Sequence, residues 1–310
     1  MRRTQWTIVA AAVTAAATLG LIGCAATKAG PEPLQELPLQ TGSAEQSQVP
    51  SDGPAPVNAP PGNPAPPKIP LEKLDVQQVV REFSRNAAAA AVVVDHDAGT
   101  TLISQDADRQ FYAGSLVKLL VGVDAITRTA SSAATRREVI RMIEVSDDDI
   151  CSHFWVQNGG GQAIIGRMSK LMGLQATEPP KTRAGQWGDT LITANDVVRI
   201  YDYILNDAPS VVRMALLGGL TGAAKYGADG FNQYFGIPAV LKEHRWAIKQ
   251  AWTDNDQAVS VHTTGLIGGG GDDWQYTVIL LTEHPRPQTY DVATRSVTSA
   301  ARAVSSLLEP

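Results

Sequence analysis

The chain has 310 residues and a formal net charge of −5 at pH 7, with 31 Asp and Glu against 26 Lys and Arg. This acidic balance, without a basic stripe anywhere along the chain, argues against nucleic acid as a partner. His153, His244 and His284 show no ligand spacing, so the sequence predicts no metal site.

Residues 1–23 have the features of a secretion signal. Two arginines at positions 2 and 3 precede an apolar, uncharged run at 6–22, and this combination is typical of a cleaved signal peptide. The motif Leu-Ile-Gly-Cys that ends at Cys24 resembles a lipobox, in which the cysteine is diacylated. We therefore expect a protein anchored by lipid to the cell membrane, on its extracytoplasmic face. The alternative is a transmembrane anchor, but the run is at the short end for spanning a bilayer and no cationic stop-transfer segment follows it.

Residues 24–74 are predicted to be a flexible linker. The segment 31–70 holds 12 of the 19 prolines, with Gly, Ser, Gln and Asn between them. Such a composition cannot bury a core and should be extended. At about 3.1 Å per residue in polyproline geometry, the segment could hold a domain up to roughly 120 Å from the lipid.

Residues 75–310 have a globular composition and should form one large domain. Strand patterns occur near both ends of this region, and helical patterns lie between them. This order predicts an antiparallel sheet built from N- and C-terminal strands, flanked by helices, with a reduced all-helical subdomain. The expected helices are 75–86, one that begins near Ser115, 133–144, 147–157, 162–172, 193–206 and 288–308. The expected strands are 90–95, 101–104, 246–252, 258–265 and 275–283.

The first candidate for chemistry is the pair Ser115 and Lys118. If Ser115 opens a helix, Lys118 lies one turn later on the same face. A serine hydroxyl is a poor nucleophile until a nearby base takes its proton, and a neutral lysine can be that base. The alternative is a helix-capping serine with a solvated lysine, because Ser-x-x-Lys is a short motif that also arises by chance.

Two further stretches could face the same cleft. Ser146, which precedes Asp147 and Asp148, could relay a proton to a leaving amine, although it could also be a helix cap with an acidic first turn. Lys249 stands in the apolar strand pattern 246–252, where a lysine is unusual. It could be a fixed cation for a substrate carboxylate, or an ordinary edge-strand charge.

These motifs together resemble a known family. The order Ser-x-x-Lys from Ser115, Ser-Asp from Ser146 and a strand lysine at Lys249 is similar to that of class A β-lactamases and penicillin-binding proteins. The resemblance runs from about residue 75 to the end. It is closest to divergent alanine-rich lipoproteins of actinobacteria that carry a β-lactamase-like domain.

The resemblance implies a role for each matched residue. Ser115 would be the acylated nucleophile, Lys118 its general base and Ser146 the proton relay. Lys249 would bind the substrate carboxylate, and the backbone N–H groups of Ser115 and Trp252 would form the oxyanion hole. The implied substrate-binding residues are Asp148, Lys249, Gln250 and Trp252.

The chain also departs from the family pattern. Asp148 stands where the family has Asn, and its carboxylate could form an ion pair with Lys118 that weakens the lysine as a base. Gln250 and Ala251 replace a threonine and a glycine. Ser115 and Ser146 are only 31 residues apart, so the helical subdomain must be short.

Four other features have more ordinary interpretations. Glu178 stands where β-lactamases carry a deacylating glutamate, but a carboxylate in a proline-rich loop is more often simply exposed. Cys151 is expected to be a small buried residue, not a nucleophile. His262 opens a possible counterpart of the Lys-Thr-Gly motif, but it lacks the lysine and suits the next strand better. Trp187 and Gly188 could line the cleft.

The leading functional prediction is a serine acyl-enzyme hydrolase or transpeptidase-like protein. Its substrates would be peptidoglycan peptides or β-lactam-like compounds, with no cofactor, and we expect a monomer. The alternative is a catalytically silent binding protein for cell-wall peptide or a protein partner, which the departures at Asp148, Gln250 and Ala251 favour. A solute-binding lipoprotein would need two similar lobes, and the sequence shows no such duplication.

Overall fold

The computed structural model describes residues 74–128, 132–268 and 273–308. The predicted signal peptide, Cys24 and the linker up to residue 73 lie outside the described residues. No helix within the described ranges is both long and apolar enough to cross a lipid bilayer.

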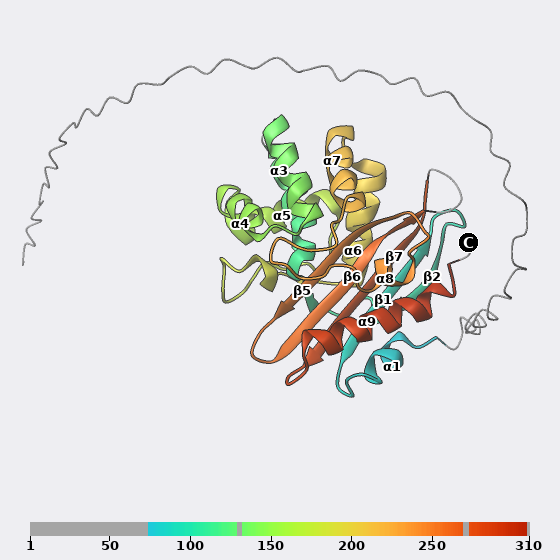
Figure 1. The fold of residues 1–310 in the computed structure, drawn as a ribbon. Coiled ribbons are helices and arrows are strands. Elements are labelled where there is room, and N and C mark those ends of the chain that lie inside the picture. Colours follow the sequence, from blue (N-terminus) through green and yellow to red (C-terminus); the bar gives the residue numbers. More distant parts are fainter. Residues whose placement is uncertain (1–73, 129–131, 269–272, 309–310) are drawn as a thin grey trace, which may run out of the picture. The chain divides into compact units, whose positions relative to one another are not determined.

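A five-stranded antiparallel sheet forms the centre of the domain (Figure 1). The strand order is β2-β1-β7-β6-β5, so the two N-terminal strands pair with three strands from the C-terminal part of the chain. This arrangement confirms the predicted fold class. The strands are β1 (Ala88–Asp95), β2 (Thr100–Gln105), β5 (Trp246–Asp254), β6 (Ala258–Gly268) and β7 (Trp274–Pro285).

Helices cover both faces of this sheet. In Figure 1, α1 (Val76–Arg81) and α9 (Tyr290–Ser305) lie across one face, while α3, α4, α5 and α7 gather together beyond it. Successive side chains of a strand point to opposite faces. Strand β1 accordingly sends Ala90 and Val92 into the core on the helical side and Ala91 and Val93 into the core under α9.

The helices follow the predicted order, with some changes at their ends in α1 and in the second layer. The predicted helix 75–86 ends earlier, at Arg81, and the predicted helix 193–206 ends in a π-helical turn at 203–207. The α-helices of this layer are α2 (Val117–Arg128), α3 (Ala133–Glu144), α4 (Asp148–Gln157), α5 (Gly160–Met172), α6 (Ala194–Asp202) and α7 (Ser210–Thr221), and a short α8 (Ile237–Val240) precedes β5.

Helix α7 was not predicted from the sequence. Its Gly218-Gly219 pair disfavours a helix in isolation. In the structure, a Cβ atom on Gly219 would lie 2.7 Å from the Cβ of Ile143 in α3. Glycine therefore lets the two helices pack closely, and this contact outweighs the weak local propensity.

Two short strands, β3 (Phe111–Tyr112) and β4 (Leu191–Ile192), form a separate antiparallel pair. They bring the segment before Ser115 beside the loop that carries Trp187. The sequence predicted neither strand, because two residues are too few to show a period.

Candidate active site

Ser115 lies in a 3-10 turn, Gly114–Leu116, that runs directly into α2. Gly114 has a positive φ of 50°, and a Cβ atom there would lie 3.3 Å from Cγ2 of Thr253 in β5. Glycine thus allows the turn to sit against the edge strand. Lys118 follows one turn later, and its Nζ donates to Ser115 Oγ at 2.7 Å. Both side chains are buried.

The ammonium of Lys118 has two further partners. Its Nζ lies 2.7 Å from Oδ1 of Asp148 and 4.1 Å from the centroid of the Trp187 ring. A carboxylate and the face of an indole both stabilise a cation. Asp148 differs from Lys118 in exposure, since 63% of its side chain is accessible to solvent while the lysine is fully covered. The departure from the family pattern at Asp148 therefore produces an ion pair on the candidate base.

A second serine–lysine pair joins the helical layer to the sheet. Lys249 Nζ donates to Ser146 Oγ at 3.0 Å and to the backbone oxygen of Gln250 at 2.9 Å. Ser146 has a left-handed φ of 54° at the reversal between α3 and α4, and Asp147, not Ser146, caps α4. Burial and the nearby charge of Lys118 lower the pKa of Lys249 well below its ordinary value, although Asp148 opposes this shift.

A cavity of about 210 Å³ opens over Ser115. Trp187 and Gly188 line it, as the sequence suggested, together with Trp252. Arg183 and Asp189 also line it, and the sequence gave no signal for them because they lie in an irregular loop far along the chain from Ser115. The complete lining is Gly114, Ser115, Asp148, Arg183, Gln186, Trp187, Gly188, Asp189, Trp252, Thr253 and Asp254.

The remaining predicted substrate-binding residues are placed differently. Gln250 points away from Lys249, and its amide donates to the backbone oxygens of Gln233 at 2.9 Å and Phe235 at 2.6 Å. It does not line the cavity over Ser115, so the structure does not bring it to the other candidates. Trp252 lines the cavity, but its ring stacks on Phe231 with centroids 4.7 Å apart.

Two other candidate groups stand apart from the nucleophile. Glu178 does not line the Ser115 cavity, and it forms an ion pair with Lys181 at 2.7 Å that lowers the pKa of the carboxyl. Cys151 is fully buried, and burial raises the pKa of its thiol to about 12. A thiol held in its neutral form is a poor nucleophile.

His262 belongs to β6, the next strand of the sheet, and not to the edge strand that carries Lys249. The imidazole is buried between two backbone groups, with Nε2 2.8 Å from the oxygen of Tyr112 and Nδ1 accepting from the N–H of Thr282 at 3.1 Å. Because Nδ1 accepts, Nε2 carries the proton and the ring is neutral. His262 therefore has a structural role.

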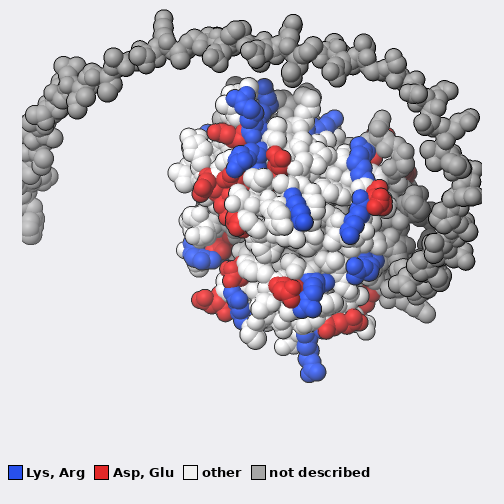
Figure 2. Space-filling view, in the orientation of Figure 1, with Lys and Arg blue, Asp and Glu red and all other residues white. Residues whose placement is uncertain are grey.

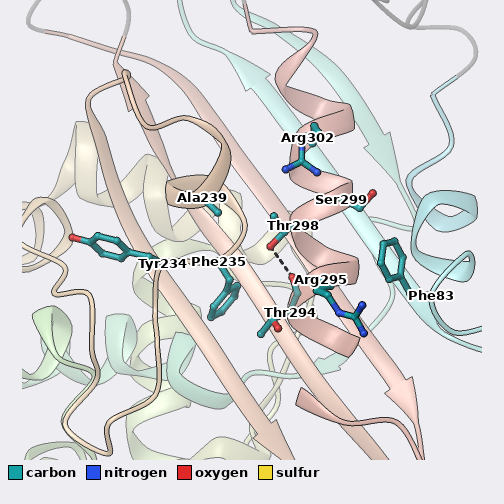
Figure 3. A pocket seen from close by; sticks show the side chains of 9 residues that line it. All are labelled: Phe83, Tyr234, Phe235, Ala239, Thr294, Arg295, Thr298, Ser299 and Arg302. Atoms are coloured by element: carbon teal, nitrogen blue, oxygen red, sulfur yellow. Dashed lines mark hydrogen bonds between the residues drawn. The ribbon is translucent and has the colours of Figure 1, made fainter. Parts of the chain in front are cut away.

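A further cavity lies on the face of the sheet that α9 covers. Figure 3 shows Arg295 and Thr298 of α9 along this cavity, with Tyr234 and Phe235 on its other side. Its volume is about 360 Å³, and neither serine–lysine pair contributes to its lining.

The fold of this chain is that of class A β-lactamases and penicillin-binding proteins. It is similar to a β-lactamase from Chitinophaga pinensis, with a TM-score of 0.60 and 10% identity over 76% of this chain and 99% of that one. It is also similar to a PBP-A variant solved as an acyl-enzyme complex with penicillin G, with a TM-score of 0.59 and 16% identity over 79% and 99% of the two chains.

Sequence comparison connects the chain to lipoproteins. It is 28% identical over 238 residues to the protein named "Putative lipoprotein LppW" of Mycobacterium tuberculosis and Mycobacterium bovis. The alignment covers 74% of this chain and 73% of the relative. No family model matches the sequence. The resemblance stated from the sequence motifs is thus confirmed for the fold and for the lipoprotein relatives.

Proposed function

We propose that this protein is a lipid-anchored, extracytoplasmic serine acyl-enzyme hydrolase or transpeptidase-like protein. Its substrates would be peptidoglycan peptides or β-lactam-like compounds. The observation that carries the proposal is the 2.7 Å contact between Ser115 Oγ and Lys118 Nζ beneath an open cavity. A nucleophile within hydrogen-bond reach of an amine is the arrangement that activates a serine.

The proposed reaction forms an acyl-enzyme at Ser115. Lys118, in its amine form, takes the hydroxyl proton while Oγ attacks the acyl carbon. The bond from Oγ to the acyl carbon forms, the bond from that carbon to the leaving group breaks, and the proton passes from Lys118 to the leaving group. Ser146 lines the neighbouring cavity, which shares Asp148 with the Ser115 cavity, and its proposed role is to relay this proton. Water or an acceptor amine then releases the acyl group from Ser115 and restores the hydroxyl.

The ion pair between Asp148 and Lys118 should make this reaction slow. The Asp148 carboxylate and the Ser115 hydroxyl compete for the same Nζ atom of Lys118, each at 2.7 Å. Glu178, which would activate the deacylating water by analogy, is engaged by Lys181. We therefore expect a slowly formed and long-lived acyl-enzyme.

A fluorescent penicillin tests the proposal directly. The mature protein, incubated with the compound for hours, should gain one covalent label that peptide mass spectrometry locates on Ser115. The Ser115→Ala variant should gain none, while its thermal unfolding should remain close to that of the unchanged protein. A folded protein that carries no Ser115-dependent label would count against the proposal.

The ion pair also favours a second candidate, a catalytically silent binding protein for cell-wall peptide or a protein partner. Contacts with Asp148 and Trp187 hold the side chain of Lys118 in place. The lysine could then have a structural role in the wall of the cleft without accepting a proton. This candidate predicts peptide binding that is unchanged in Ser115→Ala, without turnover. Turnover that disappears in that variant would exclude it.

A further inference from the structure

Two adjoining hollows lie beside α8 and α9, and neither is lined by Ser115 or Lys118. The first is the cavity of about 360 Å³ described above. The second has a volume of about 450 Å³ and shares Tyr234 and Ala239 with the first, so the two hollows meet at these residues. Each has the volume of a typical ligand site.

The charged side chains that line these two hollows are all cationic. Arg295 and Arg302 of α9 line the first hollow, and Lys225 and Lys242 line the second. No carboxylate of the described residues lines either one, and Glu243, which follows Lys242, is outside both linings. Figure 2 shows basic side chains over the region where α8 and α9 lie in Figure 1. The cations come from separate segments, which is why the sequence shows no basic stripe.

Three of these four cations lack an acidic partner. Lys225, Lys242 and Arg302 are exposed, and they form no ion pair within the part of the chain that the structure describes. Arg295 pairs with Asp291 at 3.0 Å, but 61% and 77% of the two side chains are accessible to solvent. An exposed pair of this kind contributes little to stability, so an anionic ligand can compete for the guanidinium.

Aromatic rings lie between the cations. The ring of Tyr234, which both hollows share, meets the ring of Trp246 edge to face, with centroids 5.7 Å apart. The Tyr234 hydroxyl donates to the backbone oxygen of Ala223 at 3.2 Å, which fixes the ring. Phe83 and Phe235 add apolar surface to the first hollow. Rings held in this way offer apolar faces to flat rings of a ligand.

The two sides of the first hollow are tied together before any ligand binds. The N–H of Gly236 donates to Thr298 Oγ1 of α9 at 2.9 Å, which connects the segment of Tyr234 to the helix that carries both arginines. Figure 3 shows Arg295 and Arg302 on this helix. They are seven residues apart, or about 10 Å along the helix axis. A ligand that reaches both arginines and the lysines of the second hollow must therefore be an extended chain with charges at intervals.

We infer that these hollows bind an acidic polysaccharide, a chain of sugar rings that carries anionic groups at intervals. The four cations contact the anionic groups, and Tyr234 and Trp246 pack against the apolar faces of the sugars. A flat bilayer surface fits less well, because the rings are recessed: Phe235 is buried, and Phe83 and Trp246 are half-buried. The site is separate from Ser115, so the inference does not depend on acylation there.

Isothermal titration calorimetry tests the inference on the mature chain with Cys24→Ser, so that no lipid anchor contributes to binding. The probes are ten-sugar oligosaccharides of hyaluronate and of heparin, which carry carboxylates and sulfates. At least one should bind, with an affinity that falls as salt is added, because the contacts are ionic. Dextran of the same length, which is uncharged, should bind at least about tenfold more weakly. Poly-L-glutamate, which has charges but no rings, should bind about fivefold more weakly.

Two variants separate the contribution of the charges from that of the ring. The double substitution Lys242→Gln with Arg302→Gln removes two exposed cations and should weaken oligosaccharide binding about tenfold or more. Tyr234→Leu removes the shared ring and should weaken it about fivefold. The matched control is Arg128→Gln with Lys170→Gln, which removes two exposed cations outside both linings and should leave the affinity unchanged. Thermal unfolding checks that each variant is folded.

Each outcome decides the inference. Binding of neither oligosaccharide overturns it, and so does binding that the double substitution at Lys242 and Arg302 leaves unchanged. Poly-L-glutamate that binds as tightly as the oligosaccharides overturns it in favour of a site for any polyanion. Vesicles of anionic phospholipid that bind more tightly than the oligosaccharides, through the same cations, overturn it in favour of a lipid surface. Salt-dependent oligosaccharide binding that is weakened in both variants and kept in the control establishes it.

Discussion

The start of α2 and the junction of α3 with α4 each bring a serine hydroxyl to a lysine amine, at 2.7 Å for Ser115 with Lys118 and 3.0 Å for Ser146 with Lys249. The hydrogen bonds are alike, but the surroundings differ. Lys118 donates to the carboxylate of Asp148, whereas Lys249 donates to two neutral oxygens, those of Ser146 and of the Gln250 backbone. The comparison teaches that two equally buried lysines can be held by different partners, an acidic carboxylate in one case and neutral oxygens in the other.

The largest expected effect is the loss of acylation when the first lysine is removed. Lys118→Met keeps the length of the side chain but leaves Ser115 without an amine, so the rate of labelling should fall about a thousandfold. In this variant water can solvate the unpaired carboxylate of Asp148, because that side chain is largely exposed. The fold should therefore survive. Circular dichroism checks the fold. Labelling at the rate of the unchanged protein would show that Lys118 is not the base.

Acid should destabilise the whole domain, and this effect must be separated from any titration of the two pairs. Burial lowers the pKa of His262 and of His284 to about 4, from 6.5 in the unfolded chain. The unfolded state then binds more protons between these two values, so stability rises with pH across this window. The free energy of unfolding should fall by about 3 kcal/mol for each histidine between pH 7 and pH 4.

Urea unfolding at several pH values measures this dependence. His262→Gln offers an amide in place of the imidazole and cannot titrate, so the slope between pH 4 and 6.5 should decrease by about half. An unchanged slope would mean that His262 is not the group that takes up the proton.

Removing the second lysine should stabilise the protein. In the fold Lys249 is buried with a lowered pKa, so near neutral pH the unfolded state binds its proton more tightly than the folded state does. Burial of Lys249 therefore lowers the free energy of unfolding, and this loss should decrease as the pH rises toward the ordinary pKa of lysine. Lys249→Met should raise the free energy of unfolding by about 2 kcal/mol at pH 7 and by less at pH 10.

The corresponding change at the first pair gives the contrast. Lys118→Met removes an ion pair as well as an amine, so it should not stabilise the protein at either pH. Equal stabilisation by both substitutions would mean that the ion pair with Asp148 does not make the contribution of Lys118 to stability different from that of Lys249.

The smallest effect concerns the ring that covers Lys118. Trp187 Nε1 donates to Ser152 at 3.1 Å, which helps to fix the ring 4.1 Å from the ammonium. Trp187→Leu removes a cation–π contact typically worth about 1 kcal/mol, so it should change the rate of labelling at Ser115 by less than about tenfold. Trp187→Phe keeps a ring and should change the rate less. Identical rates for the two variants would show that the ring face contributes nothing.

The sequence anticipated much of the fold because the relevant signals are local. The apolar strands at 246–252 and 258–265 and the helices at 133–144 and 147–157 lie where periodicity placed them, within a few residues. Helix α7 was missed, because its glycines are explained only by the contact with α3. Local propensity cannot report a packing partner.

The candidate site was anticipated less evenly. Residue spacing alone could place Lys118 beside Ser115, because three residues make one helical turn. Strand alternation already implies that Gln250 faces away from Lys249. The sequence could not show that the Gln250 amide would bind the backbone of Gln233 and Phe235, because those groups are brought to it only by the fold. Arg183 and Asp189 gave no signal, because irregular loops have no period.

What the sequence determined by itself is the order of its elements and the identity of its reactive groups, since both depend on neighbours within a few residues. The tertiary structure alone decided that Asp148 would meet Lys118 and that Lys249 would be covered beside Ser146. Charge states and cavities depend on groups that are distant in the chain and adjacent in space. The chemistry of this site is therefore a property of the folded domain.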